Sequence, residues 1–127
     1  MTSKNTSIQN CYQEARNYPD LAWRLIGIGV QSYTVDTATS TILYRFADGE
    51  NTIHPDGHLL RSIASQFNNE KTIAAIRNNQ LGQTDYPAFM NEIAMAGVRF
   101  YEATLIGDAK RVTYIGTGGF YEERIPL

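Results

Sequence analysis

The stretch "YPDLAWRLIGIGVQSY" at residues 18–33 has a counterpart in "YPAFMNEIAMAGVRFY" at residues 86–101. Both begin with Tyr-Pro, and both end with Gly-Val followed closely by a tyrosine. Matching positions are separated by a constant 68 residues, as Tyr18 is from Tyr86. Self-similarity at a fixed offset is typical of a repeated structural unit, so the sequence predicts two copies of one unit in the chain.

Each copy of this stretch predicts a helix that leads into a strand. Pro19 and Pro87 suit the first position of a helix, where a missing N–H group has no intrahelical partner to lose. Gly29 and Gly97 follow the apolar helical stripe at the position where a left-handed residue often ends a helix. We therefore expect two helices that end at these glycines, each followed at once by a strand.

The similarity continues beyond the first strand. "TILYRFADGE" at residues 41–50 aligns with "RVTYIGTGGF" at residues 111–120, with Tyr44 opposite Tyr114. In both segments apolar side chains alternate with polar ones, which is the pattern of a strand with one buried face. Both copies are therefore predicted to contain a second strand.

Hairpin signals follow the second strands. Asp48-Gly49 and Gly118-Gly119 are dipeptides that suit two-residue hairpin turns, and a third strand is expected after each. The glycine-rich "GTGG" also resembles a phosphate-binding loop, but such a loop needs a helix after it, and a strand-like segment follows here. The repeats, helix-strand-strand-strand twice, then span residues 18–55 and 86–126.

The remaining residues predict further helices. Thr6 and Gln9 have the spacing of a capping box at the start of an N-terminal helix. The linking segment, residues 56–85, is predicted to form two helices: one capped by Asp56 with an apolar stripe to Phe67, and one over 70–80 that Gly82 ends.

Composition indicates one globular domain. The 127 residues are 43% hydrophobic and 19% charged, enough for a real core, and a copy of about 40 residues is too short to fold alone. We therefore predict a single α+β domain over residues 1–127, built from an internal duplication with pseudo-twofold symmetry. The N-terminal helix and the two linking helices complete it.

Charge and hydropathy exclude several classes of partner. The formal net charge is −2, so no basic field attracts nucleic acid. No apolar run is long enough for a signal peptide or a membrane span. Cys11 is the only cysteine, so an internal disulfide is impossible. A cytoplasmic protein that binds neither nucleic acid nor membrane is expected.

"HPDGH" at residues 54–58 supplies both histidines of the chain, with Asp56 between them. A metal site would need a third ligand from elsewhere in the fold, and Pro55 and Gly57 make this segment a turn, so the two rings need not face one point. We predict no metal and no cofactor. A small metal-dependent or hydrolytic enzyme using His54 and His58 remains an alternative.

Tyrosine is abundant, with eight residues in the chain. Six of them form pairs between the copies, including Tyr33 with Tyr101. One interpretation is that these rings pack beneath the helices with their hydroxyls at the rim. The other predicts a ligand-binding cleft bordered by Tyr33 and Tyr101, with Arg99 as the nearest charge that can orient a polar or anionic group.

The C-terminal half resembles a known family. The points of resemblance are Ala75-Ile76-Arg77, Gln80, Gly82, Tyr86, Phe89, Ala96-Gly97, Tyr101, Tyr114-Ile115-Gly116, Gly119 and Pro126. The chain is similar in these positions to the YbcV-like bacterial proteins of unknown function, which often bear the label "phage envelope protein". The resemblance implies no established activity, cofactor or catalytic residue.

Together these observations favour a non-enzymatic bacterial or prophage-borne accessory protein that binds a partner or a ligand. A structural phage component is a further alternative. The last strand, "FYEERIP" at residues 120–126, would leave an edge with apolar and aromatic side chains. We therefore expect a homodimer.

Overall fold

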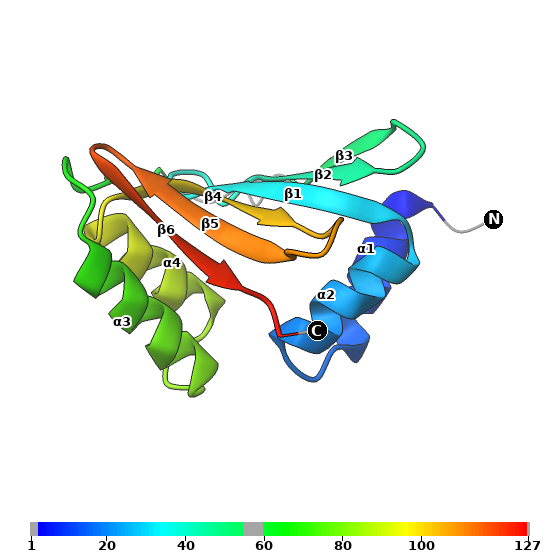
Figure 1. Cartoon of the computed structure of the whole chain (residues 1–127), viewed down its shortest axis with the longest axis horizontal. Helices are drawn as coiled ribbons and strands as arrows, with labels where there is room; N and C mark the ends of the chain where they lie inside the picture. The colour runs from blue at the N-terminus through cyan, green and yellow to red at the C-terminus, as the bar shows by residue number, and fades with distance from the viewer. Residues whose placement is uncertain (1–2, 55–59, 127) are drawn as a thin grey trace.

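The computed structural model describes residues 3–54 and 60–126, which form an α+β domain with one antiparallel sheet (Figure 1). Across the sheet the strands run in the order β3-β2-β1-β4-β5-β6. In chain order the elements are α1 (Lys4–Glu14), α2 (Tyr18–Gly27), β1 (Val30–Asp36), β2 (Ile42–Phe46), β3 (Asn51–His54), α3 (Asn69–Gln80), α4 (Tyr86–Met95), β4 (Val98–Thr104), β5 (Arg111–Gly116) and β6 (Gly119–Arg124).

The predicted fold class is confirmed, and both halves of the described chain have the same element order: helix, helix, strand, strand, strand. Strands β1 and β4 meet at the centre of the sheet, where Thr34 lies directly opposite Glu102. The second and third strands of each half follow outward on either side. The N-terminal helix thus holds the same place in its half as α3 does in the other. That the halves arose by duplication stays a prediction.

All four helices that the described residues form lie on one side of the sheet, α1 and α2 under one end and α3 and α4 under the other (Figure 1). The core forms between them, because alternate strand residues point towards the helices. Its large side chains that are almost completely buried are Ile8, Leu25, Val35, Tyr44, Met90, Ile93, Val98 and Leu105. No helix of residues 3–54 and 60–126 lies on the other side of the sheet.

The glycines that end the repeated helices have the expected conformation. Gly29 has φ +98° and Gly97 has φ +88°, backbone values that residues with a side chain rarely adopt. The helices also begin as predicted, with a proline in the first turn after a capping side chain, Asn17 for α2 and Asp85 for α4. These local signals determine the residue at which each helix ends and the next strand begins.

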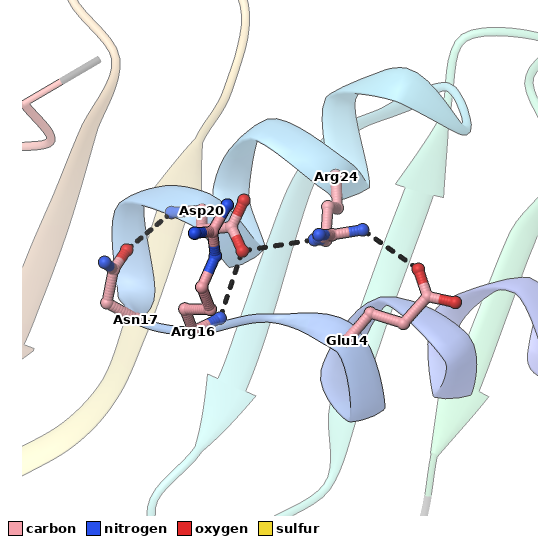
Figure 2. Close-up of polar contacts among 5 residues, drawn as sticks. All are labelled: Glu14, Arg16, Asn17, Asp20 and Arg24. Carbon is pink, nitrogen blue, oxygen red and sulfur yellow. Dashed lines mark hydrogen bonds and ion pairs between the residues drawn. The ribbon is translucent and has the colours of Figure 1, made fainter.

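A polar cluster holds the corner between α1 and α2 (Figure 2). Asp20 Oδ2 accepts hydrogen bonds from the backbone N–H of Arg16 at 3.0 Å and from Arg24 Nε at 3.2 Å. Arg24 also forms an ion pair with Glu14 at 2.9 Å. The backbone hydrogen bond from Arg16, followed by the one from Arg24, lowers the pKa of Asp20. The corner therefore keeps α1 against α2 at neutral pH.

The first of the two predicted linking helices is wrong over its described part. Residues 60–68 form an irregular strap whose backbone N–H groups bond to distant elements: Arg61 to Ala38 at 2.9 Å and Phe67 to Thr117 at 3.0 Å. Ala64 likewise bonds to a carbonyl of α4. The bonds recur every third residue, a spacing close to that of a helical stripe. Its predicted cap, Asp56, lies outside the described residues.

Two smaller predictions also need correction. The N-cap of α1 is Ser3, whose hydroxyl oxygen accepts from the N–H of Thr6, so Thr6 lies inside the helix. The β5–β6 turn consists of Thr117 and Gly118, because Gly116 pairs directly with Gly119. Gly116 and Gly119 allow close packing, since a Cβ on Gly119 would lie 2.9 Å from the Phe67 ring, whereas Gly118 supplies the φ of +86° in the turn.

Candidate functional site

A cavity of about 420 Å³ opens on the helix side of the sheet. Its walls come from α1, the β1–β2 loop, β2, β3 and the first residue of α4, so both halves contribute. The lining residues are Ile8, Gln9, Tyr12, Ser40, Ile42, Tyr44, His54 and Tyr86. Two isoleucines and three tyrosine rings make much of the wall apolar, while hydroxyl, amide and imidazole groups give it polar points.

A pair of tyrosine hydroxyls marks the cavity wall. The hydroxyl oxygens of Tyr12 and Tyr44 lie 2.7 Å apart, within hydrogen-bond distance. Burial of the hydroxyl raises the pKa of Tyr12 to about 12, and burial also raises the pKa of Tyr44. Both groups are therefore protonated at neutral pH. Because only one of the two protons is used within the pair, the other O–H can donate to a further acceptor.

Ser40 contributes a further hydroxyl to the cavity wall, from a residue with an uncommon backbone conformation. It is buried and has φ +60°, a left-handed conformation that is uncommon for a residue with a side chain. Its N–H donates to the carbonyl of Asp36 at 2.8 Å, and its Oγ accepts from an Arg61 guanidinium nitrogen at 2.5 Å. Arg61 thus fills an acceptor position of Ser40 and leaves the Ser40 O–H able to donate.

His54 lies at the end of β3, opposite Ile42 on β2. Its ring meets the Tyr44 ring edge to face, with centroids 5.6 Å apart. Within residues 3–54 and 60–126, its buried Nε2 has no hydrogen-bond partner. A buried polar atom without a partner is uncommon and needs an explanation.

The position in the second half that matches His54 carries a side chain with several polar partners. Glu123 on β6 lies opposite Val112 on β5, as His54 lies opposite Ile42. Glu123 forms an ion pair with Arg77 at 2.6 Å and accepts hydrogen bonds from Gln80 and from the Tyr121 hydroxyl, both at 3.0 Å. Side chains of α3 and β6 therefore satisfy each other's charge and hydrogen-bonding groups at this position.

The family model for a protein of unknown function, DUF1398, matches residues 6–118. The chain belongs to this family. The matched range contains every residue that lines the cavity. A comparison with curated proteins found no match.

Two of the residues predicted to bind a ligand lie in the core. Tyr33 is 3% exposed and Tyr101 is 7% exposed. The Tyr33 ring packs on Tyr44 at 5.5 Å between centroids, directly behind the cavity wall, and its hydroxyl bonds to that of Tyr18 at 2.5 Å. The Tyr101 ring packs on Phe89 and on Tyr114.

The third predicted ligand-binding residue, Arg99, is exposed, and its Nε donates to the Thr117 hydroxyl at 3.1 Å. None of the three is among the residues that line the cavity. A direct role of Tyr33, Tyr101 or Arg99 in ligand binding stays a prediction.

The histidine pair can be followed only in part, because His58 and Asp56 lie outside the described residues. In the parts of the chain that are described, no three His, Cys, Asp or Glu side chains group closely enough to hold a metal ion. A search of the same residues found no helix that is both long and apolar enough to span a membrane.

Sequence reasoning missed most of the cavity wall. Tyr12 lies four residues after Ile8 on α1, a helical spacing that indicates packing rather than a hydroxyl at a cavity. Tyr86 is the first residue of α4, and its place at the start of a repeat indicates a helix start rather than a cavity wall. Ser40 lies in a loop whose left-handed residue carries no glycine signal. The aromatic content of the repeats was the one signal that indicated this side of the sheet.

Proposed function

We propose that the chain is a binding module for a small, neutral molecule that carries hydrogen-bond acceptors, held in the cavity beside His54. The observation that carries the proposal is the contrast between the two halves. At the matching positions of β3 and β6, Glu123 has three polar partners, whereas His54 faces a cavity and its Nε2 has none among the described residues.

The size and chemistry of the wall suit such a molecule. Ligand cavities commonly measure about 300–1,000 Å³ and combine apolar walls with a few placed polar groups, and this cavity falls in that range at about 420 Å³. Ser40 and the pair of Tyr12 and Tyr44 present hydroxyl donors. Carbonyl, ether or hydroxyl oxygens on the ligand would accept from them.

The absence of charge in the described wall favours a neutral ligand. Its residues include no Asp, Glu, Lys or Arg. Burial raises the tyrosine pKa values, so these hydroxyls also carry no charge at neutral pH. A charged group moved from water into such a site would lose hydration without gaining a counter-charge, which costs free energy.

The test uses the full chain and a set of small neutral aryl amides and ketones, with carboxylates and amines of matched shape. We expect neutral members to shift the NMR signals of Gln9, Ser40 and His54, with little effect from charged analogues. Tyr12→Phe keeps the ring but removes one cavity hydroxyl, so affinity should fall roughly five- to tenfold, the equivalent of one hydrogen bond.

Tyr121→Phe is the matched control, because it removes a hydroxyl from the occupied half. Its affinity for the neutral probes should equal that of the unmodified chain. The proposal fails if no neutral probe shifts the cavity signals, or if the two variants weaken binding equally.

The other functions considered stay hypotheses. A metal-dependent or hydrolytic reaction would use His54 and His58, and a structural role in a phage particle follows only from the resemblance to YbcV-like proteins. Prophage origin and a cytoplasmic location are likewise hypotheses. We also propose a homodimer, as the apolar and aromatic residues of the β6 edge led us to expect.

A further inference from the structure

Among the described elements, no helix covers the side of the six-stranded sheet that faces away from α1–α4 (Figure 1). Several of its apolar side chains reach solvent. Phe120 is 66% exposed and Phe100 is 37% exposed. Ile53 on β3 is exposed as well.

The exposed apolar side chains of the second half form a continuous row. Phe100 on β4 lies directly opposite Ile115 on β5, and Ile115 lies directly opposite Phe120 on β6. Directly opposed residues of antiparallel strands point to the same face and touch. These three residues, the apolar row, therefore make one contiguous patch that runs from a central strand to the edge.

A second row crosses the same face and carries arginines. Direct strand partners connect its six members, which are Asn51, Arg45, Ser32, Thr104, Arg111 and Arg124. Arg111 and Arg124 lie directly opposite each other, an arrangement of like charges that is unfavourable unless something compensates for it. We call this set the arginine row.

Between these rows lies a middle row with Thr34 and Glu102 at its centre and Glu122 at the β6 end. Its carboxylates pair with the arginine row: Glu102 with Arg45 at 3.5 Å and Glu122 with Arg111 at 3.2 Å. The acidic groups are thus compensated within the chain. The described residues offer Arg124 no such partner.

We infer that a second copy of this chain covers this face, with the two sheets packed face to face. A twofold axis along the middle row exchanges the outer rows, so the apolar row of each copy lies on the arginine row of the other. Arginine stacks well on aromatic rings, and such contacts strengthen when water is excluded. The Arg124 guanidinium, for which the described residues offer no acidic partner, then packs on a phenylalanine ring of the other copy.

The area of the face is sufficient for a stable pair. Six strands about 4.8 Å apart and roughly 20 Å long give a face of about 600 Å² per copy. A pair would bury about 1,200 Å², above the roughly 1,000 Å² expected of a specific interface. This inference rests on the homodimer proposed above and adds the surface that forms it; it is independent of the ligand cavity on the opposite side.

Sedimentation velocity on the full chain, from about 1 to 500 μM, tests the inference, with thermal melts to show that each variant is folded. We expect a dimer, and we expect Phe100→Glu and Phe120→Glu each to weaken the dimer at least 100-fold. Phe100 is the decisive position, because a central strand cannot take part in edge pairing. Leu81→Glu is the matched control, since Leu81 is 72% exposed but follows α3 on the helix side, and it should leave the dimer intact.

A monomer at every concentration would overturn both the homodimer and its surface. A dimer that survives Phe100→Glu but dissociates with Phe120→Glu would overturn the surface alone and indicate pairing through the β6 edge. Survival of the dimer in both variants would also overturn the surface. If Phe100→Glu does not fold, Ile115→Lys on β5 replaces it, with the same expected dissociation.

Discussion

The two halves of the molecule differ at matching ends of their third strands. In the second half, Arg77 of α3 reaches Glu123 of β6, and Tyr121 and Gln80 complete the contact. In the first half, His54 of β3 stands beside a cavity of about 420 Å³. The backbone order is the same in both. Among the described residues, Glu123 therefore has polar partners on α3 and β6, whereas the Nε2 of His54 has none.

The halves also differ in how tightly their glycines are enclosed. A Cβ on Gly97 would lie 2.2 Å from the carbonyl oxygen of Gln66, because the strap crosses the second half at this point. Among the described residues, a Cβ on Gly29 would come within 4 Å of the Phe46 ring alone, at 3.8 Å. The second half is thus packed closely around its helix end, and the first half leaves space there.

The largest effect is expected from the core tyrosines. Tyr33→Ala and Tyr101→Ala should each lower the free energy of unfolding by about 3–5 kcal/mol, because both rings are nearly fully buried and truncation leaves a cavity. Urea denaturation measures this cost. If both variants lose less than about 1 kcal/mol, the rings line an open cleft, as the alternative interpretation of the sequence predicts.

Alanine substitution of the two helix-ending glycines should lower stability by a smaller amount, and by different amounts in the two halves. Gly97→Ala should cost about 3 kcal/mol, since it adds a clash with the strap to the strain of positive φ. Gly29→Ala carries the strain alone and should cost about 1 kcal/mol. Melting temperatures compare the two directly. Equal losses of stability would show that the strap moves aside for the added methyl group, and that the closer packing around Gly97 does not affect stability.

Alkaline pH should destabilise the fold through its buried tyrosines. Burial raises the pKa of Tyr33, Tyr44 and Tyr101 above the ordinary value of 10.0. A folded-state pKa above the unfolded value gives stability that is complete below about pH 10 and is lost as the pH rises towards the folded-state pKa. The melting temperature should therefore stay level from about pH 7 to 9 and fall above pH 10.

Tyrosinate absorbance recorded during the same titration provides the control. Ionisation of the buried rings should coincide with loss of the folded signal, because these rings ionise only when exposed. A fully folded protein with ionised buried tyrosines would contradict this prediction.

The smallest effect on stability is expected at the matching positions of the third strands, Glu123 and His54. Glu123→Gln weakens an ion pair that solvent partly screens and should cost about 1 kcal/mol. His54→Gln should cost less, about 0.5 kcal/mol, since it loses the edge contact of the ring with Tyr44 but, among the described residues, no hydrogen bond of Nε2. Chemical denaturation resolves both values. A loss at His54 as large as that at Glu123 would show that His54 already has a strong partner.

Local chemistry in the sequence predicted much of the fold. Pro19 and Pro87 placed the helix starts, and Gly29 and Gly97 placed the helix ends, because caps depend on residues next to one another. Alternation along residues 42–46 predicted a strand with Tyr44 and Phe46 inward, and both are buried. Such signals operate within a few residues, so they can be read without knowledge of distant parts of the chain.

The strap and the cavity could not be read in this way. Residues 60–68 have a nearly helical spacing, but their N–H groups bond to carbonyls of the β1–β2 loop, α4 and the β5–β6 turn. The cavity likewise exists only where Tyr12, Tyr44 and Tyr86 come together from three separate elements. Neighbouring residues in the sequence predicted the fold class, the strands and the ends of the repeated helices, but they also predicted a helix where the strap lies. Tertiary structure alone decided which polar groups found partners, because a hydrogen bond between distant segments depends on where the whole chain brings them.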